Sequence, residues 1–306
     1  MSTARESIGI VGAGLMGRGM ALNLIKAGYP VTLYLRRERP EIARLVELGA
    51  ASTNDLSALA AACEVLILCV DSAETVRAVV AGLLPGLRQG QLIIDSTTSN
   101  PGVSRQVAAM LKEKGVDYAD APVTGGPVEA EAGRLGAIVG CDEESFARVE
   151  RIVSNYSVSA QRVGAVGTGH TAKLLNNFVT QGAVVLLAEA YGRARESGVD
   201  WRALYALMSA GAARSGTLEK TVKPALEGNF DGNRFAIRNS RKDITYFCEL
   251  AAGSARGPSA LAEAIREVLD GAVAAGLGDR YVSALLDPQV KLTLPRNDGS
   301  RRENTE

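Results

Sequence analysis

Three glycines near the start of the chain constrain its fold more than any other feature. Gly12, Gly14 and Gly17 form a G-x-G-x-x-G pattern between a short apolar run, residues 8–11, and an apolar-periodic segment, residues 16–27. A strand that turns through such a pattern into a helix opens a βαβ unit. The first glycine permits the tight turn, the second lets the backbone approach a ligand, and the third allows close helix–strand packing. The free N–H groups of a helix start favour a phosphate there. We therefore expect a dinucleotide pyrophosphate to contact Gly12, Ala13, Gly14, Leu15, Met16 and Gly17.

Short β-branched runs alternate with helical patterns through the first half of the chain. The expected strands are residues 8–11, 31–35, 65–69, 92–95 and 116–119, and the expected helices include 16–27 and 73–83. This alternation is typical of a parallel sheet with helices on both faces. It predicts an α/β, Rossmann-type, doubly wound nucleotide-binding domain over residues 1–164.

The pattern of apolar residues changes after Gly164, from alternating strands and helices to helices. No proline interrupts residues 168–197, and the centre of that segment, Val184–Ala190, has little polar face. A helix that is apolar all round is expected to be buried on all sides, and this one would be about 45 Å long. Further helical patterns follow at 201–208, 217–223, 242–252 and 258–275. We expect a long interdomain helix leading into an all-helical substrate and oligomerisation domain over 165–292, then a disordered tail over 293–306.

Charge and cysteine usage exclude several classes of partner. The 34 basic and 34 acidic side chains cancel, so no net field draws the protein to nucleic acid or to an anionic membrane. The four cysteines (Cys63, Cys69, Cys141, Cys248) lack the spacing of metal ligands or of a disulfide framework, and no metal site is expected. Neither a secretory signal nor an uncharged run of ~20 residues is found. We expect a cytoplasmic protein.

The end of the second expected strand discriminates between nicotinamide cofactors. Enzymes that use NAD usually carry Asp or Glu there to accept from the ribose 2′-hydroxyl. This chain instead has Arg36 and Arg37, whose guanidinium groups suit a 2′-phosphate. NADP(H) is therefore expected in preference to NAD(H). The alternative is a solvated basic corner, offset by Glu38 and Glu41.

Other strand ends supply further candidates, because open α/β sheets bind ligands at the carboxyl ends of their strands. The expected cofactor contacts are Cys69, Val70, Asp71 and Thr97, and Ser96 is an expected substrate contact.

Four segments in order resemble motifs of the β-hydroxyacid dehydrogenase family, which includes 3-hydroxyisobutyrate dehydrogenases and tartronate semialdehyde reductases. They are residues 12–28, the run DAPVTGG at 120–126, the run GTGHTAKLLNN at 167–177, and Lys242-Asp243. The resemblance covers nearly the whole chain. It implies that Thr124, Gly125 and Gly126 bind the substrate, and consecutive N–H groups at a glycine pair suit a carboxylate. The family usually has serine where this chain has Thr124, and the extra methyl narrows the pocket.

The resemblance also implies the catalytic groups. Lys173 would be the acid/base that removes the hydroxyl proton of an alcohol or returns it to a carbonyl. Asn177, four residues on and therefore on the same helix face, would orient the substrate or the lysine, and Lys242 would contact cofactor or substrate. His170 is expected to be a polar residue of the first turn.

The resulting hypothesis is an NADP(H)-dependent oxidoreductase that transfers a hydride between the nicotinamide and a small β-hydroxy acid or its semialdehyde, as a homodimer or homotetramer. One alternative is an imine reductase on the same fold, which usually replaces the catalytic lysine. A second is a non-catalytic nucleotide-binding relic, which would be expected to lose Lys173 or the Thr-Gly-Gly loop. A phosphogluconate-type dehydrogenase is also distantly similar, but the chain is short for that type, and its helix reads Lys-Leu-Leu-Asn-Asn without the histidine expected after the lysine.

Overall fold

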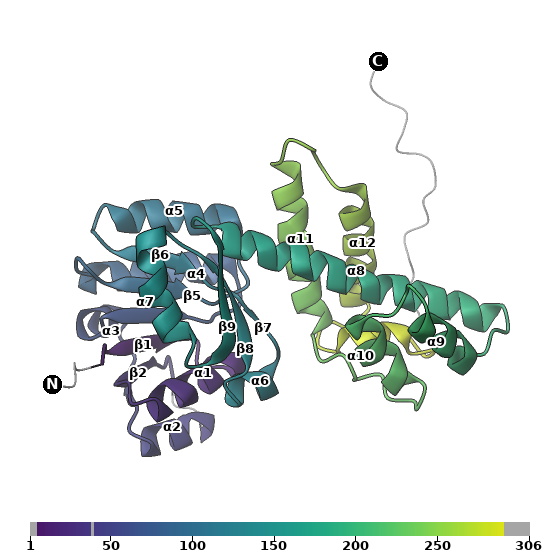
Figure 1. The fold of residues 1–306 in the computed structure, drawn as a ribbon, viewed down its shortest axis with the longest axis horizontal. Helices are drawn as coiled ribbons and strands as arrows, with labels where there is room; N and C mark the ends of the chain where they lie inside the picture. Colours follow the sequence, from purple (N-terminus) through teal and green to yellow (C-terminus); the bar gives the residue numbers. More distant parts are fainter. Residues whose placement is uncertain (1–4, 38–39, 291–306) are drawn as a thin grey trace. The chain divides into compact units, whose positions relative to one another are not determined.

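A computed structural model describes residues 5–37 and 40–290 of the chain (Figure 1). It contains two compact units, the first ending at Lys173 and the second beginning at Leu174. The division falls inside the long helix α8 (Thr168–Glu196). The tail expected to be disordered, residues 293–306, lies outside the described residues. Within the described ranges, no helix is both long enough and apolar enough to cross a membrane.

A nine-stranded sheet forms the centre of the first unit, and six of its strands run parallel in the order β3-β2-β1-β4-β5-β6. Their bounds are β1 (Ile8–Val11), β2 (Val31–Tyr34), β3 (Ala51–Thr53), β4 (Val65–Leu68), β5 (Leu92–Asp95) and β6 (Asp117–Asp120). Strand order reverses at β1, which pairs with β2 on one side and β4 on the other. This is the switch point at which a doubly wound sheet opens a crevice for a ligand. The expected Rossmann-type fold is confirmed.

Three further strands extend the sheet beyond β6: β7 (Val123–Thr124), β8 (Leu135–Gly140) and β9 (Ser157–Gly164). The central strand of this extension, β8, is antiparallel to β6 and β7 and parallel to β9. The sequence analysis missed all three, and β3 as well. The reason is clearest for β9, which is mostly exposed and therefore carries few of the apolar residues that mark a buried strand.

Helices connect the strands of the first unit (Figure 1). Their bounds are α1 (Leu15–Lys26), η1 (Pro40–Ile42), α2 (Ala43–Glu47), α3 (Leu56–Ala62), α4 (Ala73–Leu83), η2 (Leu84–Gly86), α5 (Pro101–Lys112), α6 (Pro127–Glu131) and α7 (Glu143–Val153). Local sequence sets several of their starts: Ser72 accepts the N–H of Thr75 at the start of α4, and Asn100 accepts that of Gly102 at α5. Such caps satisfy N–H groups that have no partner within the helix.

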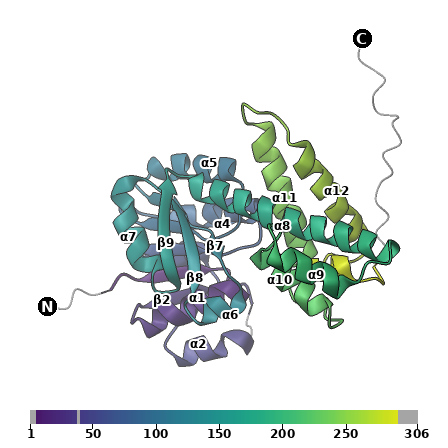
Figure 2. The same cartoon turned by 45° about the vertical axis from the view of Figure 1, so that its right-hand side comes forward.

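The second unit is helical, as expected. After α8 come α9 (Trp201–Ala210), α10 (Gly216–Ala225), α11 (Ile237–Ala252), α12 (Ala260–Ala274) and η3 (Val282–Leu286). Helices α11 and α12 run side by side in both views (Figures 1 and 2). A small core forms around the buried Tyr191 of α8, whose ring meets Trp201 edge-on at 5.1 Å.

One expectation about the helices is wrong, and another is not met within a single chain. Helix α8 is not buried on all sides: Leu175, Val179 and Leu186 are 49%, 67% and 62% exposed. The apolar sequence predicts a helix that is buried on all sides, but within one chain these three side chains are exposed. Helix α11 begins at Ile237 rather than near Lys242, because Ile237, Ser240 and Ile244 form one buried helix face that the polar residues between them obscure.

Candidate active site

The glycine turn lies at the carboxyl end of β1, at the switch point of the sheet. Gly12 has a φ of 100°, a conformation that glycine adopts freely, and a side chain there would collide with the Cys69 carbonyl. A side chain at Gly17 would collide with the Gly12 carbonyl, whereas one at Gly14 would meet nothing within 4 Å. Open space beside Gly14, at the start of α1, fits the close approach of a pyrophosphate.

Arg36 and Arg37 follow β2, and both are exposed. Neither guanidinium forms an ion pair with a carboxylate in the part of the chain that the structure describes. Glu41, one of the acids weighed against them, lies in η1, and the other, Glu38, lies outside the described residues. Two exposed guanidinium groups at this strand end suit a phosphate group.

The loops that follow β4 and β5 are tied to each other. Thr97 accepts the backbone N–H of Val70 through its hydroxyl at 3.1 Å, and its own N–H donates to Asp95 Oδ1 at 3.0 Å. Asp95 Oδ2 also accepts from the hydroxyl of Tyr118 at 2.8 Å. Burial, with the Asp95 charge, holds the pKa of Tyr118 well above its usual range, so Tyr118 stays a donor. These bonds fix Val70 and Thr97, both expected cofactor contacts, at the carboxyl edge of the sheet.

The remaining strand-end candidates differ in what their side chains offer. Burial raises the pKa of the Cys69 thiol to about 12, which keeps it neutral and unreactive. Asp71 accepts from the Thr75 hydroxyl at 2.6 Å on the exposed side of α4. Ser96 is 4% exposed, and its hydroxyl is closed to solvent, so this structure offers a substrate no access to that oxygen.

A buried carboxylate anchors the start of α8. Asp120, at the end of β6, accepts the N–H of Gly167 at 2.6 Å and the N–H of His170 at 2.7 Å. Gly169 packs so closely on the carbonyls of Asp120 and Ile138 that a side chain would not fit. Burial raises the pKa of Asp120, and His170 and the two N–H groups oppose that rise. The segment of residues 167–170 thus attaches the start of α8 to β6 and β8.

Sequence reasoning underrated His170, which is fully buried. Its Nδ1 lies 2.6 Å from the Ser104 hydroxyl and its Nε2 lies 2.7 Å from the Thr97 carbonyl oxygen. These partners are 66 and 73 residues away in sequence. The resemblance of residues 167–177 to a family motif was the one available signal, and it does not specify the partners.

The Thr-Gly-Gly segment leads from β7 to α6, and one of its N–H groups already binds a carboxylate. Gly126 donates its N–H to Glu129 Oε2 at 2.8 Å, and Gly125 has a φ of 103°. The Thr124 hydroxyl makes only a long contact, 3.5 Å, with the Gly136 carbonyl. The Gly126 N–H thus has a carboxylate partner within the chain, Glu129, with which a substrate carboxylate would compete. Nothing in the sequence analysis anticipated Glu129.

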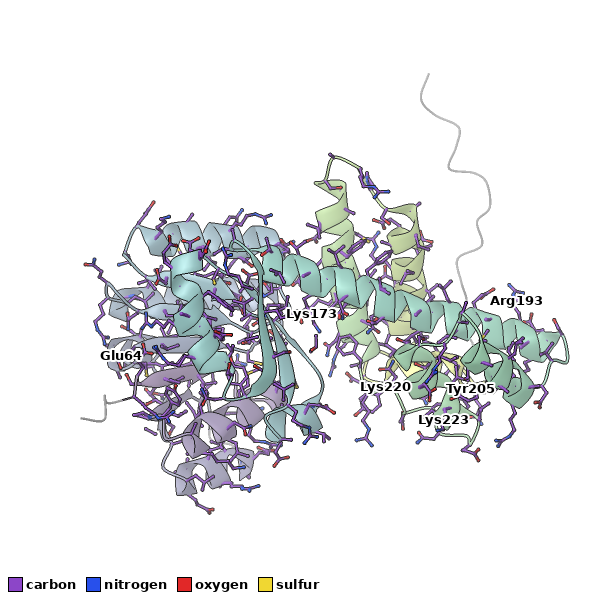
Figure 3. The ribbon with its side chains drawn as sticks, viewed as in Figure 1. Glu64, Lys173, Arg193, Tyr205, Lys220 and Lys223 are labelled. Atoms are coloured by element: carbon purple, nitrogen blue, oxygen red, sulfur yellow. The ribbon has the colours of Figure 1, made fainter. Side chains whose placement is uncertain are left out.

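Lys173 extends from α8 (Figure 3) and is half-buried. Asn177, one turn farther along the same helix, is 4% exposed and donates from Nδ2 to Asp243 Oδ2 at 2.7 Å. Asp243 is itself buried and lies 3.3 Å from Lys242 Nζ. The Lys242–Asp243 pair thus fixes the Asn177 amide, a role for Asp243 that sequence reasoning did not name.

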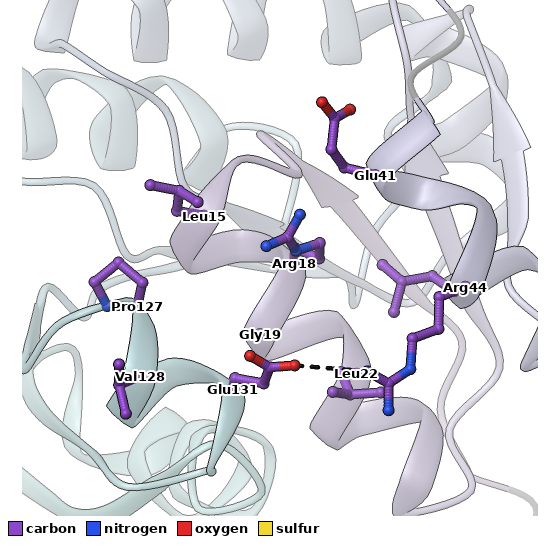
Figure 4. Close-up of a pocket in the computed structure, with 10 residues that line it drawn as sticks. Leu15, Arg18, Gly19, Leu22, Glu41, Arg44, Pro127, Val128 and Glu131 are labelled. Atoms are coloured by element: carbon purple, nitrogen blue, oxygen red, sulfur yellow. Dashed lines mark ion pairs between the residues drawn. The ribbon is translucent and has the colours of Figure 1, made fainter.

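A cavity of about 320 Å³ lies between α1, α2 and α6 (Figure 4). Its apolar wall includes Leu15 and Val128, and its charged groups include Arg18 and an exposed pair, Arg44 with Glu131 at 3.6 Å. The lining includes neither Thr124 nor Lys173. Leu15 is the one expected cofactor contact among the described residues that line it.

Both units of the chain match known protein families. Residues 7–169 match the family model of the NAD binding domain of 6-phosphogluconate dehydrogenase, and residues 167–288 match that of the NAD-binding domain of NADP-dependent 3-hydroxyisobutyrate dehydrogenase. The chain is 30% identical over 290 residues to 2-(hydroxymethyl)glutarate dehydrogenase from Eubacterium barkeri, covering 94% of this chain and 95% of that protein.

Solved structures show the same fold. A 3-hydroxyisobutyrate dehydrogenase from Mycobacterium tuberculosis with L-serine has a TM-score of 0.83 at 25% identity, covering 92% of this chain and 98% of the other. An imine reductase from Pseudomonas sp. is 21% identical with a TM-score of 0.59, covering 92% and 98%; at that identity the match concerns the fold alone.

The fold and the matched domains define an oxidoreductase with a nicotinamide-dinucleotide-binding domain. Within that class, the chain belongs to the β-hydroxyacid dehydrogenase family, as its four motifs predicted.

Proposed function

We propose that this protein is an NADP(H)-dependent β-hydroxyacid dehydrogenase that interconverts a small β-hydroxy acid and its semialdehyde. The observation that carries the proposal is Lys173 in the second turn of α8, whose start is anchored by the buried Asp120. Asn177 lies one turn later with its amide held by Asp243. A non-catalytic relic has no use for a lysine and an amide aligned in this way.

When bound, the nicotinamide supplies or accepts the hydride. The chain's own residues handle the proton and the alignment. Lys173 Nζ takes the proton of the substrate hydroxyl as the hydride leaves, and returns it to the carbonyl oxygen in reduction. Asn177, its amide oriented by Asp243, holds the substrate or the lysine in line. The N–H of Gly126, once Glu129 moves aside, binds the substrate carboxylate.

The cofactor phosphate decides between NADP(H) and NAD(H). Arg36 and Arg37 are exposed and free of ion pairs with described residues, which supports a 2′-phosphate contact. Each exposed charge contributes only modestly, so we expect a preference rather than an absolute requirement. The variant that tests this preference replaces both arginines, Arg36→Ser with Arg37→Ser. The matched control is Arg256→Ser, which removes an exposed arginine of the second unit.

The test of the proposed function is a substrate panel read by NADPH absorbance. The panel contains 3-hydroxyisobutyrate, serine, threonine, glycerate and 4-hydroxybutyrate, the corresponding semialdehydes, and cyclic imines. We expect turnover of at least one hydroxy acid or semialdehyde, faster with NADP(H) than with NAD(H), and slower turnover of imines. Imine reduction faster than every carbonyl reduction would favour the imine reductase, and no turnover at all would favour the relic.

We also propose that the protein is a homodimer or homotetramer. One face of α8 presents Leu175, Val179 and Leu186 to solvent at 49–67% exposure, and they recur at helical spacing. A single chain leaves this apolar stripe in water at a free-energy cost of about 25 cal/mol per Å². A second copy would cover it. Size-exclusion chromatography with light scattering tests this, and a monomer of 32.0 kDa would contradict it.

A further inference from the structure

His170 stands at a junction of three segments of the first unit. It belongs to the first turn of α8, Thr97 to the loop after β5, and Ser104 to α5. The imidazole contacts the other two at 2.7 and 2.6 Å, and it is fully buried. Buried polar groups that are paired at both ends hold their neighbours in one arrangement. The imidazole is therefore a bridge from α8 to the loop after β5.

The partners determine the tautomer of the ring. The Thr97 carbonyl oxygen can only accept a hydrogen bond, so Nε2 carries the hydrogen. Nδ1 of the neutral ring is then an acceptor, and the Ser104 hydroxyl, 2.6 Å away, is its donor. The Asn100 carbonyl oxygen, the other acceptor for that hydroxyl, is farther away at 3.3 Å. The Asp120 carboxylate lies 3.8 Å from Nδ1, beyond hydrogen-bond distance, and its oxygens accept the N–H groups of Gly167 and His170 instead.

The same loop carries the expected cofactor contacts. Thr97 binds the Val70 N–H through its hydroxyl and His170 through its carbonyl. One residue thus links the loops after β4 and β5 to the first turn of α8. Lys173 follows His170 by three residues, on the next turn of the same helix.

We propose that His170 is a positioning residue for Lys173. Asp120 holds the backbone of the α8 start against β6, and the His170 ring fixes the rotation of that turn against the Thr97 loop. The two contacts together set where the Lys173 amine lies relative to the cofactor crevice. This inference rests on the proposed acid/base role of Lys173, and it assigns His170 no contact with substrate or cofactor.

The test is a double-mutant cycle on single-turnover hydride transfer. The variants are His170→Leu, His170→Gln and Lys173→Ala, together with His170→Leu combined with Lys173→Ala, all at saturating NADPH. A shift of about 1 Å in a reacting group costs on the order of a hundredfold, so we expect His170→Leu to slow the step about 10- to 100-fold. NADPH affinity should change by no more than about threefold. His170→Gln, whose amide can donate to the Thr97 carbonyl, should recover most of the rate.

The cycle separates positioning from general stability. If His170 acts through Lys173, His170→Leu slows hydride transfer in the wild type and has no further effect once Lys173 is alanine. Equal slowing in both backgrounds, or none in the wild type, would overturn the inference. A normal rate in Lys173→Ala alone would instead overturn the proposed function, and that single variant reveals it.

Two measurements keep the inference testable if His170→Leu does not fold. Ser104→Ala removes the contact to Nδ1, together with the hydroxyl's 3.3 Å contact to the Asn100 carbonyl, and little volume. We expect a smaller slowing, about 3- to 10-fold, that also disappears without Lys173. The chain contains one histidine, so ¹⁵N-histidine labelling of the intact protein gives one pair of ring nitrogens. We expect the Nε2–H tautomer, with an unprotonated Nδ1. The Nδ1–H tautomer would contradict the bridge.

Discussion

Replacing Asp120 with asparagine is expected to destabilise the first unit, because two backbone N–H groups depend on that carboxylate. Its two oxygens accept from Gly167 at 2.6 Å and from His170 at 2.7 Å, and the side chain is fully buried. Asparagine offers one oxygen and one NH₂ group. One of the two N–H groups would then face another donor.

The magnitude follows from those contacts. A buried donor left without an acceptor costs about 1–3 kcal/mol, and the substitution leaves two such donors, the backbone N–H and the new NH₂. Relief of a buried charge offsets part of that cost. Burial raises the pKa of Asp120, so the part of the stability that comes from this shift is present below the unfolded pKa and is lost as pH rises through the raised folded pKa. The two N–H contacts remain at neutral pH and outweigh that loss. We expect a net loss of about 2–4 kcal/mol at neutral pH.

Urea unfolding followed by circular dichroism measures this loss. The matched control is Asp117→Asn on the same strand, where the carboxylate is exposed and accepts from the Ser145 hydroxyl at 3.2 Å. This variant should change stability by less than about 0.5 kcal/mol. A change that small in Asp120→Asn as well would refute the argument that Asp120 anchors α8.

Three further outcomes are expected. Glu129→Ala frees the Gly126 N–H and should lower KM for the hydroxy acid severalfold with little change in kcat; an unchanged or raised KM would remove Glu129 as a competitor. Val179→Glu places a charge on the exposed stripe of α8 and should yield monomers by light scattering, which an unchanged assembly would contradict. Burial alone would raise the pKa of Glu6, but Arg151 and Arg148 outweigh it and lower that pKa. Glu6 therefore stabilises the fold above its unfolded pKa of 4.5 and loses that contribution as pH falls through the lowered folded value. Glu6→Gln should reduce the melting temperature at pH 7 and not at strongly acid pH, and equal effects at both would refute this.

Elements with strong local signals could be predicted from the sequence. Helix α4 was expected at the bounds that the structure has, because Ser72 caps its start and its apolar residues recur at helical spacing. The buried parallel strands β1, β4 and β5 were found for a similar reason, since each is an apolar run: β1 and β4 carry no polar side chain, and β5 has one only at its end, Asp95. The exposed strand β9 offers no such run.

The residues of the candidate site also fall into those that the sequence predicts and those that it does not. Lys173, Asn177 and the glycine turn lie in short contiguous motifs, and a motif can be read without knowing the fold. Asp120, His170 and Asp243 act through partners 47 to 73 residues away. Burial and pairing over such separations depend on how the strands and helices pack, and hydrophobic periodicity carries no information about them.

The central claim is that Lys173 is the acid/base of hydride transfer, and stopped-flow measurement of Lys173→Ala at saturating NADPH tests it most directly. Lys223→Ala, an exposed lysine of α10 (Figure 3), is the matched control. We predict a hydride-transfer rate at least about a hundredfold below wild type in Lys173→Ala, with NADPH affinity unchanged, and a normal rate in Lys223→Ala. A Lys173→Ala enzyme that transfers hydride at the wild-type rate would contradict the account.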